Sequence, residues 1–372
     1  MKRLLKTLGI LAVAGVIVAG CTKPSKQVVL AGGFTKGDEK GLALFSFNSR
    51  NGNMEKMSEF DGGPSPTLFC FSQKRDLVYV IDEVSDFKGE KAGGITTFRI
   101  GPDNKFEKAG EIPVPWGDPC FISISHDSHF LFVASYASGS IAVARLGSDG
   151  IPVSVTDTIL YVSKDSIPSH PHMIAQDPLS RHIYLTDLGL DRLMVYNMDT
   201  TSGKLNRMPF QEIHLPAGSG PRHFYFSKDG SVMYLINELG SSVMVFNVTA
   251  EGALEQFQAI KTTDENYTGK NQCAEVTLSN DGKYLYGSNR GENTIVVFKV
   301  NQGGSLSLAG RSSCGGDWPR NFILDPSGKF VISGNQKSGD IAVFRINPET
   351  GIPEGPVCKA AMKEPAFLEF IK

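Results

Sequence analysis

The sequence predicts an all-β fold in which one structural unit is repeated around a ring. When the chain is aligned with itself, a short apolar or alternating run followed by a polar turn recurs every 46 to 53 residues. The six complete copies begin at Pro66, Pro119, Pro171, Pro221, Cys273 and Pro319. Each copy continues with three more strand-like runs, and the 40 glycines with many DG and GG turns suit short strands. Four strands repeated at this period are typical of a β-propeller blade.

A seventh copy begins at Pro365, where PAFLEFIK ends the chain after a single strand. The strands missing from this copy are present at the other end of the chain, as QVVLAGG and GLALFSFN within residues 27–48. Pairing of the C-terminal strand with these N-terminal strands closes the ring and leaves no open sheet edge. We therefore predict one seven-bladed β-propeller over residues 27–372, with four antiparallel strands in each blade.

The first 21 residues have the plan of a signal peptide. Three basic residues precede an apolar run from Leu8 to Val18, which is shorter than the roughly 20 residues that a membrane-spanning helix needs. The run ends in VAGC, which resembles the lipobox of bacterial lipoproteins, where Cys21 is lipidated and becomes the mature N-terminus. Residues 22–26 then form a tether. We expect a membrane-tethered lipoprotein outside the cytoplasm, in the periplasm or at the outer membrane.

Composition excludes some classes of partner. The formal net charge of −2 and the pI near 6.4 do not indicate the basic surface that nucleic-acid binding requires. We expect a monomer, and its only membrane contact should be the lipid anchor. The sequence has no closely spaced His and Cys residues of the kind that bind a metal, and we expect no cofactor. Asp187 and Asp191 could bind a cation, but the repeat favours a structural role. The five cysteines beyond Cys21 allow one disulfide, although their apolar context favours buried thiols.

Two adjacent columns of residues follow from the repeat. The first strand of a blade is innermost and the second runs antiparallel to it, so the start of one and the end of the other share a face. Sixteen residues after the anchors the uniform column reads Asp82, Ser135, Asp187, Asn237, Asn289 and Asn335. Seventeen residues after them the variable column reads Glu83, Tyr136, Leu188, Glu238, Arg290 and Gln336. A feature present in every blade predicts strand-end capping, whereas a varied column predicts a site that is built once.

The residues that follow each anchor are also varied. His172, Arg222 and Arg320 come directly after an anchor, and His223, Glu275 and Asn321 come one position later. Together with the variable column, these side chains should converge at one mouth of the central channel. They could form a ring of salt bridges that plugs the channel, but clustering of unlike ionisable groups favours a ligand site. The substrate-binding residues predicted on this basis are His223, Arg320, Asn321, Glu83 and Gln336.

Four segments carry a resemblance to a known family: HPHMIAQDPLSRHIYLTDLGLDRLMVY, GPRHFYFSKDGSVMYLINELGSSVMVF, LSNDGKYLYGSNRGENTIVVF and WPRNFILDPSGKFVISGNQKSGDIAVFRI. They resemble the lactonase family of seven-bladed propellers, which includes a bacterial 6-phosphogluconolactonase and the fungal 3-carboxy-cis,cis-muconate lactonising enzyme. The resemblance covers the mature chain and implies an active site of His172, Arg222, Glu238 and Arg290. One motif departs from the family, because Phe121 follows Pro119 and Cys120 where the family often has PCH.

The resemblance implies hydrolysis of a sugar or sugar-phosphate lactone. Arg222 and Arg290 would bind an anionic group and stabilise the developing oxyanion. His172 or Glu238 would take a proton from water, and the ordinary imidazole pKa of about 6.5 favours His172. Two alternatives remain open at this stage: a muconate-type lactonising cycloisomerase that uses the same cationic residues, and a non-catalytic propeller that binds a ligand or partner.

Overall fold

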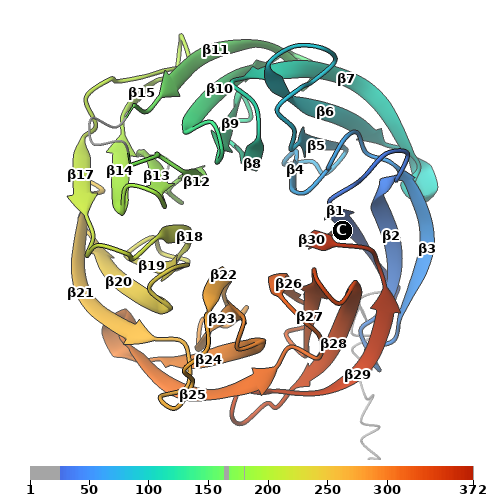
Figure 1. Cartoon of the computed structure of the whole chain (residues 1–372), viewed down its shortest axis with the longest axis vertical. Coiled ribbons are helices and arrows are strands. Elements are labelled where there is room, and N and C mark those ends of the chain that lie inside the picture. The colour runs from blue at the N-terminus through green and yellow to red at the C-terminus, as the bar shows by residue number, and fades with distance from the viewer. Residues whose placement is uncertain (1–25, 163–166, 180, 372) are drawn as a thin grey trace, which may run out of the picture.

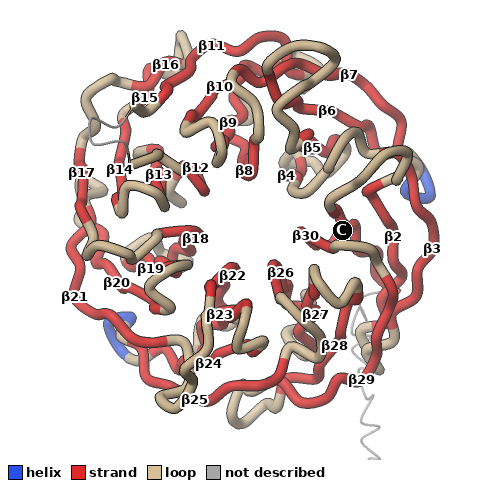
Figure 2. The backbone as a smooth tube through the Cα atoms, viewed as in Figure 1, coloured by secondary structure: helices blue, strands red, loops and turns tan. Residues whose placement is uncertain are grey.

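Seven four-stranded antiparallel sheets are arranged as blades around a common axis (Figure 1). The structure is a computed structural model that describes residues 26–162, 167–179 and 181–371. The regular elements of the described ring are strands joined by loops, apart from two short 3₁₀ turns, η1 (Pro102–Asn104) and η2 (Gln302–Gly304), which lie at its periphery (Figure 2). The predicted all-β, seven-bladed propeller is confirmed.

Each blade begins with its innermost strand. Blade 1 consists of β4 (Phe69–Phe71), β5 (Leu77–Asp82), β6 (Ala92–Ile100) and β7 (Phe106–Pro115). Blade 2 consists of β8 (Pro119–Ile124), β9 (Phe130–Ser135), β10 (Ser140–Leu146) and β11 (Pro152–Leu160). Blade 3 consists of β12 (Pro171–Gln176), β13 (Ile183–Asp187), β14 (Arg192–Tyr196) and β17 (Gln211–His214), with the small hairpin β15 (Met198–Asp199) and β16 (Lys204–Leu205) inserted before its outer strand.

The remaining blades follow the same plan. Blade 4 consists of β18 (Pro221–Phe226), β19 (Val232–Asn237), β20 (Ser242–Val248) and β21 (Leu254–Lys261). Blade 5 consists of β22 (Gln272–Leu278), β23 (Tyr284–Arg290), β24 (Thr294–Val300) and β25 (Leu306–Ser313). Blade 6 consists of β26 (Pro319–Leu324), β27 (Phe330–Asn335), β28 (Asp340–Ile346) and β29 (Pro353–Ala361).

Blade 7 closes the ring with strands from both ends of the chain. Its inner strand β30 (Pro365–Phe370) pairs with β1 (Lys26–Gly33), and β2 (Gly41–Asn48) and β3 (Met54–Asp61) complete the sheet. The predicted pairing of the termini is confirmed, and β3 is the outer strand that the repeat did not reveal. Lys26, assigned to the tether from the sequence, already pairs with Asn48 in β1. The predicted signal peptide, Cys21 and residues 22–25 lie outside the described residues.

The hydrophobic core is divided among the seven interfaces between blades. One buried cluster packs blade 4 against blade 5, and six equivalent clusters occupy the other interfaces around the ring. Hydrogen bonds support this packing: Tyr184 Oη donates to the carbonyl of Gly252 (2.6 Å) in the next blade, and Tyr234 donates to Gly304 (3.0 Å). Because apolar burial lies between blades, the ring axis is free to carry polar side chains.

Within the described residues, the five cysteines are all free, and three of them are buried, which fits the buried-thiol interpretation rather than a disulfide. Among those same residues, no helix has the length and apolar character needed to cross a membrane.

Candidate active site

The inner hairpin of each blade explains the spacing of the uniform column. Five anchors are paired in register with the residue sixteen positions later: Pro119 with Ser135, Pro171 with Asp187, Pro221 with Asn237, Cys273 with Asn289 and Pro319 with Asn335. The register shifts directly after the anchor, so His172, Arg222 and Arg320 occupy β-bulges. A bulge turns a side chain away from the regular alternation of a strand. This local irregularity aims the three basic side chains at the ring axis.

The uniform column is buried within the blades. Its six side chains are at most 1% exposed. Asn335 Nδ2 donates to the carbonyl of Cys314 (3.1 Å) and to Asp340 (2.7 Å), and Asp187 accepts from the backbone N–H groups of His170 (2.8 Å) and Leu190 (3.1 Å). These bonds tie strand ends to the loops beside them, as a structural role requires.

The sequence favoured a structural role for Asp187 and Asp191 over a cation site, and their hydrogen bonds fit that role. Asp191 accepts hydrogen bonds from the backbone N–H groups of Gly218 (2.7 Å) and Gly220 (2.6 Å), and so holds the loop that precedes β18. In the described part of the chain, no group of three or more His, Cys, Asp or Glu side chains has the arrangement of a metal site.

Glu238 lies between two arginines at the mouth of the channel. Its Oε2 atom is 3.0 Å from Nε of Arg222 and 2.6 Å from Nη2 of Arg290. The three side chains come from blades 4 and 5, and each is less than 9% exposed. A buried charge is tolerated only when it is paired and hydrogen-bonded. One carboxylate is paired with two guanidinium groups, so the group of Arg222, Glu238 and Arg290 has a net positive charge.

The carbonyl groups at the start of β22 supply the remaining partners of the arginines. Arg222 Nη1 donates to Ala274 (2.5 Å), while Arg290 donates through Nε to Gln272 (3.1 Å) and through Nη2 to Cys273 (3.0 Å). Burial lowers the pKa of Arg290 to about 9, an effect that the nearby Glu238 carboxylate opposes. Arg290 is therefore charged at neutral pH, and the hydrogen bonds fix the orientation of both guanidinium groups.

His172 lies beside this cluster in a ring of aromatic side chains. Its imidazole is 5.1 Å from that of His223 and 5.7 Å from the ring of Tyr136, measured between centroids. Nδ1 of His172 is buried and has no hydrogen-bond partner among the described residues. Burial, and after it the charge of Arg222, hold the pKa of His172 well below 6.5. The ordinary pKa expected from the sequence is therefore wrong for this residue, which is neutral at pH 7.

A second polar layer lies deeper in the channel. Glu275 accepts from Nδ2 of Asn321 (2.8 Å) and faces Nδ1 of His223 (3.3 Å). Burial lowers the pKa of His223; burial alone would raise the pKa of Glu275, but His223 and Arg222 outweigh it and lower that pKa. These three residues line a cavity of about 600 Å³ that reaches the turns at the other end of the inner strands. They therefore form a layer between the two faces of the ring.

The structure also explains the departure at the PCF motif. The ring of Phe121 packs edge-on against His223, with the centroids 5.3 Å apart. Cys120 is buried beneath His172, and burial raises the pKa of its thiol. The position where the family often has a histidine thus contributes an apolar wall to the deeper layer.

The other predicted substrate-binding residues are Glu83, Arg320 and Gln336, and the charge of Arg320 is close enough to lower the pKa values of Arg222 and Arg290. Glu83 accepts a hydrogen bond from the Thr67 hydroxyl, and burial raises its pKa while Arg320 opposes the shift. The guanidinium of Arg320 lies 5.0 Å from the ring of Phe34 in blade 7. Gln336 has a buried Oε1 atom without a hydrogen-bond partner among the described residues. These side chains are not part of the Arg222–Glu238–Arg290 cluster.

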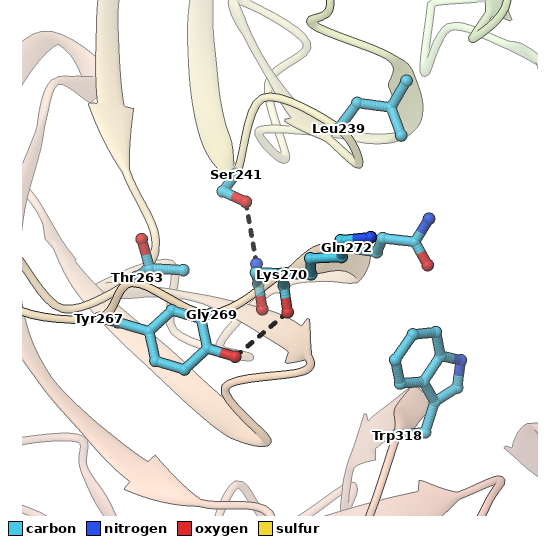
Figure 3. Close-up of a pocket in the computed structure, with 9 residues that line it drawn as sticks. Leu239, Ser241, Thr263, Tyr267, Gly269, Lys270, Gln272 and Trp318 are labelled. Carbon is cyan, nitrogen blue, oxygen red and sulfur yellow. Dashed lines mark hydrogen bonds between the residues drawn. The ribbon is translucent and has the colours of Figure 1, made fainter.

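A cavity of about 650 Å³ beside the cluster was missed by reasoning from the repeat (Figure 3). We call it the mouth cavity; its lining includes Leu239, Ser241, Tyr267, Lys270, Gln272 and Trp318, and none of the four residues implied by the family. Most of these side chains lie in loops whose sequence differs from blade to blade. The only available signal was Trp318, one of two tryptophans in the chain, directly before an anchor.

Comparison with known proteins agrees with the fold. Residues 28–370 match the family described as "Lactonase, 7-bladed beta-propeller". A 6-phosphogluconolactonase of Bacillus subtilis is 26% identical over 344 residues, covering 88% of this chain and 93% of the relative. A 6-phosphogluconolactonase of Serratia proteamaculans is 32% identical over 264 residues, covering 70% of this chain and 76% of the relative.

A solved structure extends the comparison to three dimensions. The periplasmic gluconolactonase PpgL of Pseudomonas aeruginosa superimposes with a TM-score of 0.87 at 28% identity, covering 94% of this chain and 99% of that protein. The class defined by the fold is a seven-bladed propeller with a charged channel mouth. The chain belongs to the lactonase family of seven-bladed β-propellers, which confirms the resemblance seen in the sequence.

Proposed function

We propose that the chain hydrolyses the lactone of a sugar acid, in the manner of a 6-phosphogluconolactonase, at the mouth of the propeller. The observation that carries the proposal is the convergence of Arg222 and Arg290 on Glu238 beside a neutral, unpartnered His172. The names of the Bacillus relative and of the Pseudomonas structure support hydrolysis of a lactone.

The arginines supply electrostatic stabilisation. When the oxygen of water attacks the carbonyl carbon of a lactone, negative charge develops on the carbonyl oxygen. Arg222 and Arg290 carry fixed positive charges close to one another, and their excess over Glu238 is available to this oxyanion or to a carboxylate of the substrate. Glu238 keeps the two guanidinium groups together and limits their mutual repulsion.

His172 is the base that we favour. As a neutral imidazole it accepts a proton from the attacking water while the new C–O bond forms. The imidazolium that results is buried near Arg222 and Arg320, so it is a strong acid. It returns the proton to the ring oxygen when the C–O bond of the lactone ring breaks, which leaves the open-chain hydroxy acid. In this scheme Glu238 acts through the arginines, although it remains the alternative base.

A hydrolysis assay tests the proposal. Protein lacking residues 1–21 is incubated with glucono-1,5-lactone and its 6-phosphate, and acid release is followed in a pH-stat above the spontaneous rate. Turnover that disappears in His172→Asn, while the protein remains folded, supports the proposal. Absence of turnover with every lactone, together with conversion of an unsaturated dicarboxylic acid to a lactone, would instead identify a cycloisomerase. Binding without turnover would identify a non-catalytic propeller.

We also propose that the enzyme works outside the cytoplasm, attached to a membrane through lipid on Cys21. The VAGC motif after the apolar run supports lipidation, and the Pseudomonas structure is named as a periplasmic enzyme. Intact mass spectrometry of the full chain expressed in a bacterium should show a polypeptide that begins at Cys21 and carries acyl chains. Cys21→Ser should retain residues 1–20 and carry none, since the thiol is the acylated atom. A wild-type mass without lipid would contradict this proposal.

A further inference from the structure

The mouth cavity adjoins the Arg222–Glu238–Arg290 cluster through residues that contact or follow its members. Leu239 follows Glu238 directly, the carbonyl of Gln272 accepts a hydrogen bond from Nε of Arg290 (3.1 Å), and the Trp318 ring centroid lies 5.4 Å from Cζ of Arg290. Figure 3 shows Leu239 and Trp318 on opposite sides, with Gln272 between them. A lactone ring held at Arg290 would therefore extend any large substituent into this cavity.

The walls of the cavity are held in place by specific hydrogen bonds. Asn271 Nδ2 donates to the hydroxyl of Ser241 (3.0 Å) and to Oδ1 of Asn289 (3.2 Å), so the loop before β22 is tied to blades 4 and 5. The hydroxyl of Tyr267 donates to the carbonyl of Lys270 (3.1 Å) (Figure 3). A cavity built this way is preformed and does not depend on closure of a loop.

The backbone conformation of Trp318 is shared with other blades. Its φ of 69° lies in the left-handed region, and Ser65 (50°), Asp118 (54°) and Glu364 (41°), which also directly precede an anchor proline, lie there too. Asn293 accepts a hydrogen bond from the Trp318 N–H (2.9 Å) and donates one to Asp317 (2.8 Å), and the ammonium of Lys337 lies 3.1 Å from the ring centroid. These contacts hold the Trp318 side chain in place beside the cavity.

The lining has the chemistry of a carbohydrate site. Trp318, Tyr267 and Leu239 offer apolar surface, and Leu239 is 47% exposed although it adjoins the buried Glu238. Ser241 and Gln272 place hydroxyl and amide groups between these surfaces. A sugar ring has apolar C–H faces and hydroxyl edges, which match an aromatic face bordered by neutral polar groups. The volume of about 650 Å³ lies within the range of roughly 300–1,000 Å³ that encloses drug-sized ligands, and a single hexonolactone is smaller than these.

We propose that the mouth cavity binds a second saccharide unit attached to the lactone, with Trp318 as an apolar wall that contacts the sugar, so that the preferred substrates are lactones of oligosaccharide acids. This inference rests on the proposed lactone hydrolysis and adds the class of substrate.

A comparison of two substrates tests the proposal by turnover. Wild-type enzyme should have a higher kcat/KM for cellobiono-1,5-lactone than for glucono-1,5-lactone. Trp318→Ala should lower the ratio of the two kcat/KM values by about tenfold, the loss expected for one aromatic contact, and Trp318→Phe should restore part of it. Trp116→Phe is the matched control, because Trp116 is the other tryptophan, also has a positive φ (76°) and is absent from the cavity lining. A wild-type preference for the smaller lactone, or an unchanged ratio in Trp318→Ala, would overturn the proposal.

Binding supplies a readout that does not require catalysis. In the Trp116→Phe protein, Trp318 is the sole tryptophan, and titration with cellobionate should change its fluorescence, whereas gluconate should change it less. If no lactone is hydrolysed but cellobionate still produces this change, the saccharide site stands and the proposed hydrolysis fails. If lactones are hydrolysed but cellobionate produces no change, the saccharide site is wrong and the hydrolysis stands.

Discussion

Asn237 and Glu238 are neighbours in the chain, yet they serve different parts of the molecule. Asn237 is fully buried inside blade 4, where its amide donates to the hydroxyl of Ser242 (3.0 Å) in the adjacent strand. Glu238 points towards the ring axis and holds Arg222 and Arg290. Successive side chains at the end of a strand point in opposite directions, so one position can stabilise the blade while the next faces a ligand.

The same division is present at the corresponding positions of blade 5. The amide of Asn289 donates to the hydroxyl of Thr294 (3.0 Å) within the blade and to the carbonyl of Thr262 (3.2 Å) in the loop that leads into it, whereas Arg290 reaches Glu238 across the blade boundary. The comparison teaches that side chains shared by all blades stabilise each sheet, and we propose that the side chains differing between blades form the site.

The largest effect on turnover is expected for a substitution of a residue that we propose faces the ligand. Arg222→Ala removes one of the two positive charges that face the developing oxyanion, and we expect turnover to fall on the order of a hundredfold or more. The stability should fall as well, because Glu238 and the carbonyl of Ala274 lose a buried partner. Steady-state kinetics per folded molecule, with the folded fraction measured by circular dichroism, separates the two effects. Wild-type turnover in Arg222→Ala would remove this residue from the site.

Asn335 belongs to the uniform column, and Asn335→Ala should lower mainly the free energy of unfolding. The substitution leaves the carbonyl of Cys314 and the carboxylate of Asp340 without a buried amide donor. We expect the free energy of unfolding to fall by about 1–3 kcal/mol, with kcat per folded molecule changed by less than a factor of about three. Urea denaturation and kinetics on the same preparation check both values. A large loss of kcat with unchanged stability would contradict a structural role for the uniform column.

A smaller effect is expected from the two buried histidines, His172 and His223, when the pH is lowered. Burial lowers the pKa of His172 and of His223 in the folded state, so below pH 6.5 the unfolded chain binds more protons than the folded one. Stability should therefore fall as pH decreases below 6.5, by about 1.4 kcal/mol per pH unit for each uncoupled histidine. The kcat/KM value should stay level through pH 6.5 and decline only at lower pH.

Thermal unfolding of the wild type and of His172→Asn is measured between pH 7.5 and 5. The pH dependence of stability gives the number of protons taken up on unfolding. In His172→Asn, the number of extra protons that the unfolded state binds relative to the folded state should be smaller by about one, because one buried imidazole is gone. An acid limb of kcat/KM centred at the ordinary pKa of about 6.5 would contradict a neutral, buried His172 as the base.

Much of the fold and part of the site could be predicted from the sequence. The anchors at Pro171 and Pro221 gave the register of the inner hairpins, because the spacing of sixteen is the pairing of the two strand ends. That register placed Glu238 and Arg290 on the same face as Arg222. The contacts among them depend on the bulge after Pro221, which recurs after the anchors of other blades but is not visible in the residue spacing.

The rest of the site depends on burial and on loops. The pKa of His172 is set by side chains that converge from several blades, so its residue type alone gives the wrong value. Trp318 directly precedes an anchor, but its place in the mouth cavity follows from Tyr267 and Lys270, which lie in the loop between β21 and β22. Repeats predict what blades share, and the ligand-facing loops are where blades differ.

The most direct test is a paired measurement on the neighbours Asn237 and Glu238. Glu238→Gln and Asn237→Ala are purified in the same way, and kcat per folded molecule and the free energy of unfolding are measured for each. We predict that Glu238→Gln lowers kcat by about a hundredfold or more, since the two guanidinium groups lose their shared carboxylate. Asn237→Ala should keep kcat within about threefold of wild type and lose about 1 kcal/mol of stability. Equal loss of kcat in both variants would contradict the division between the blade and the ligand site.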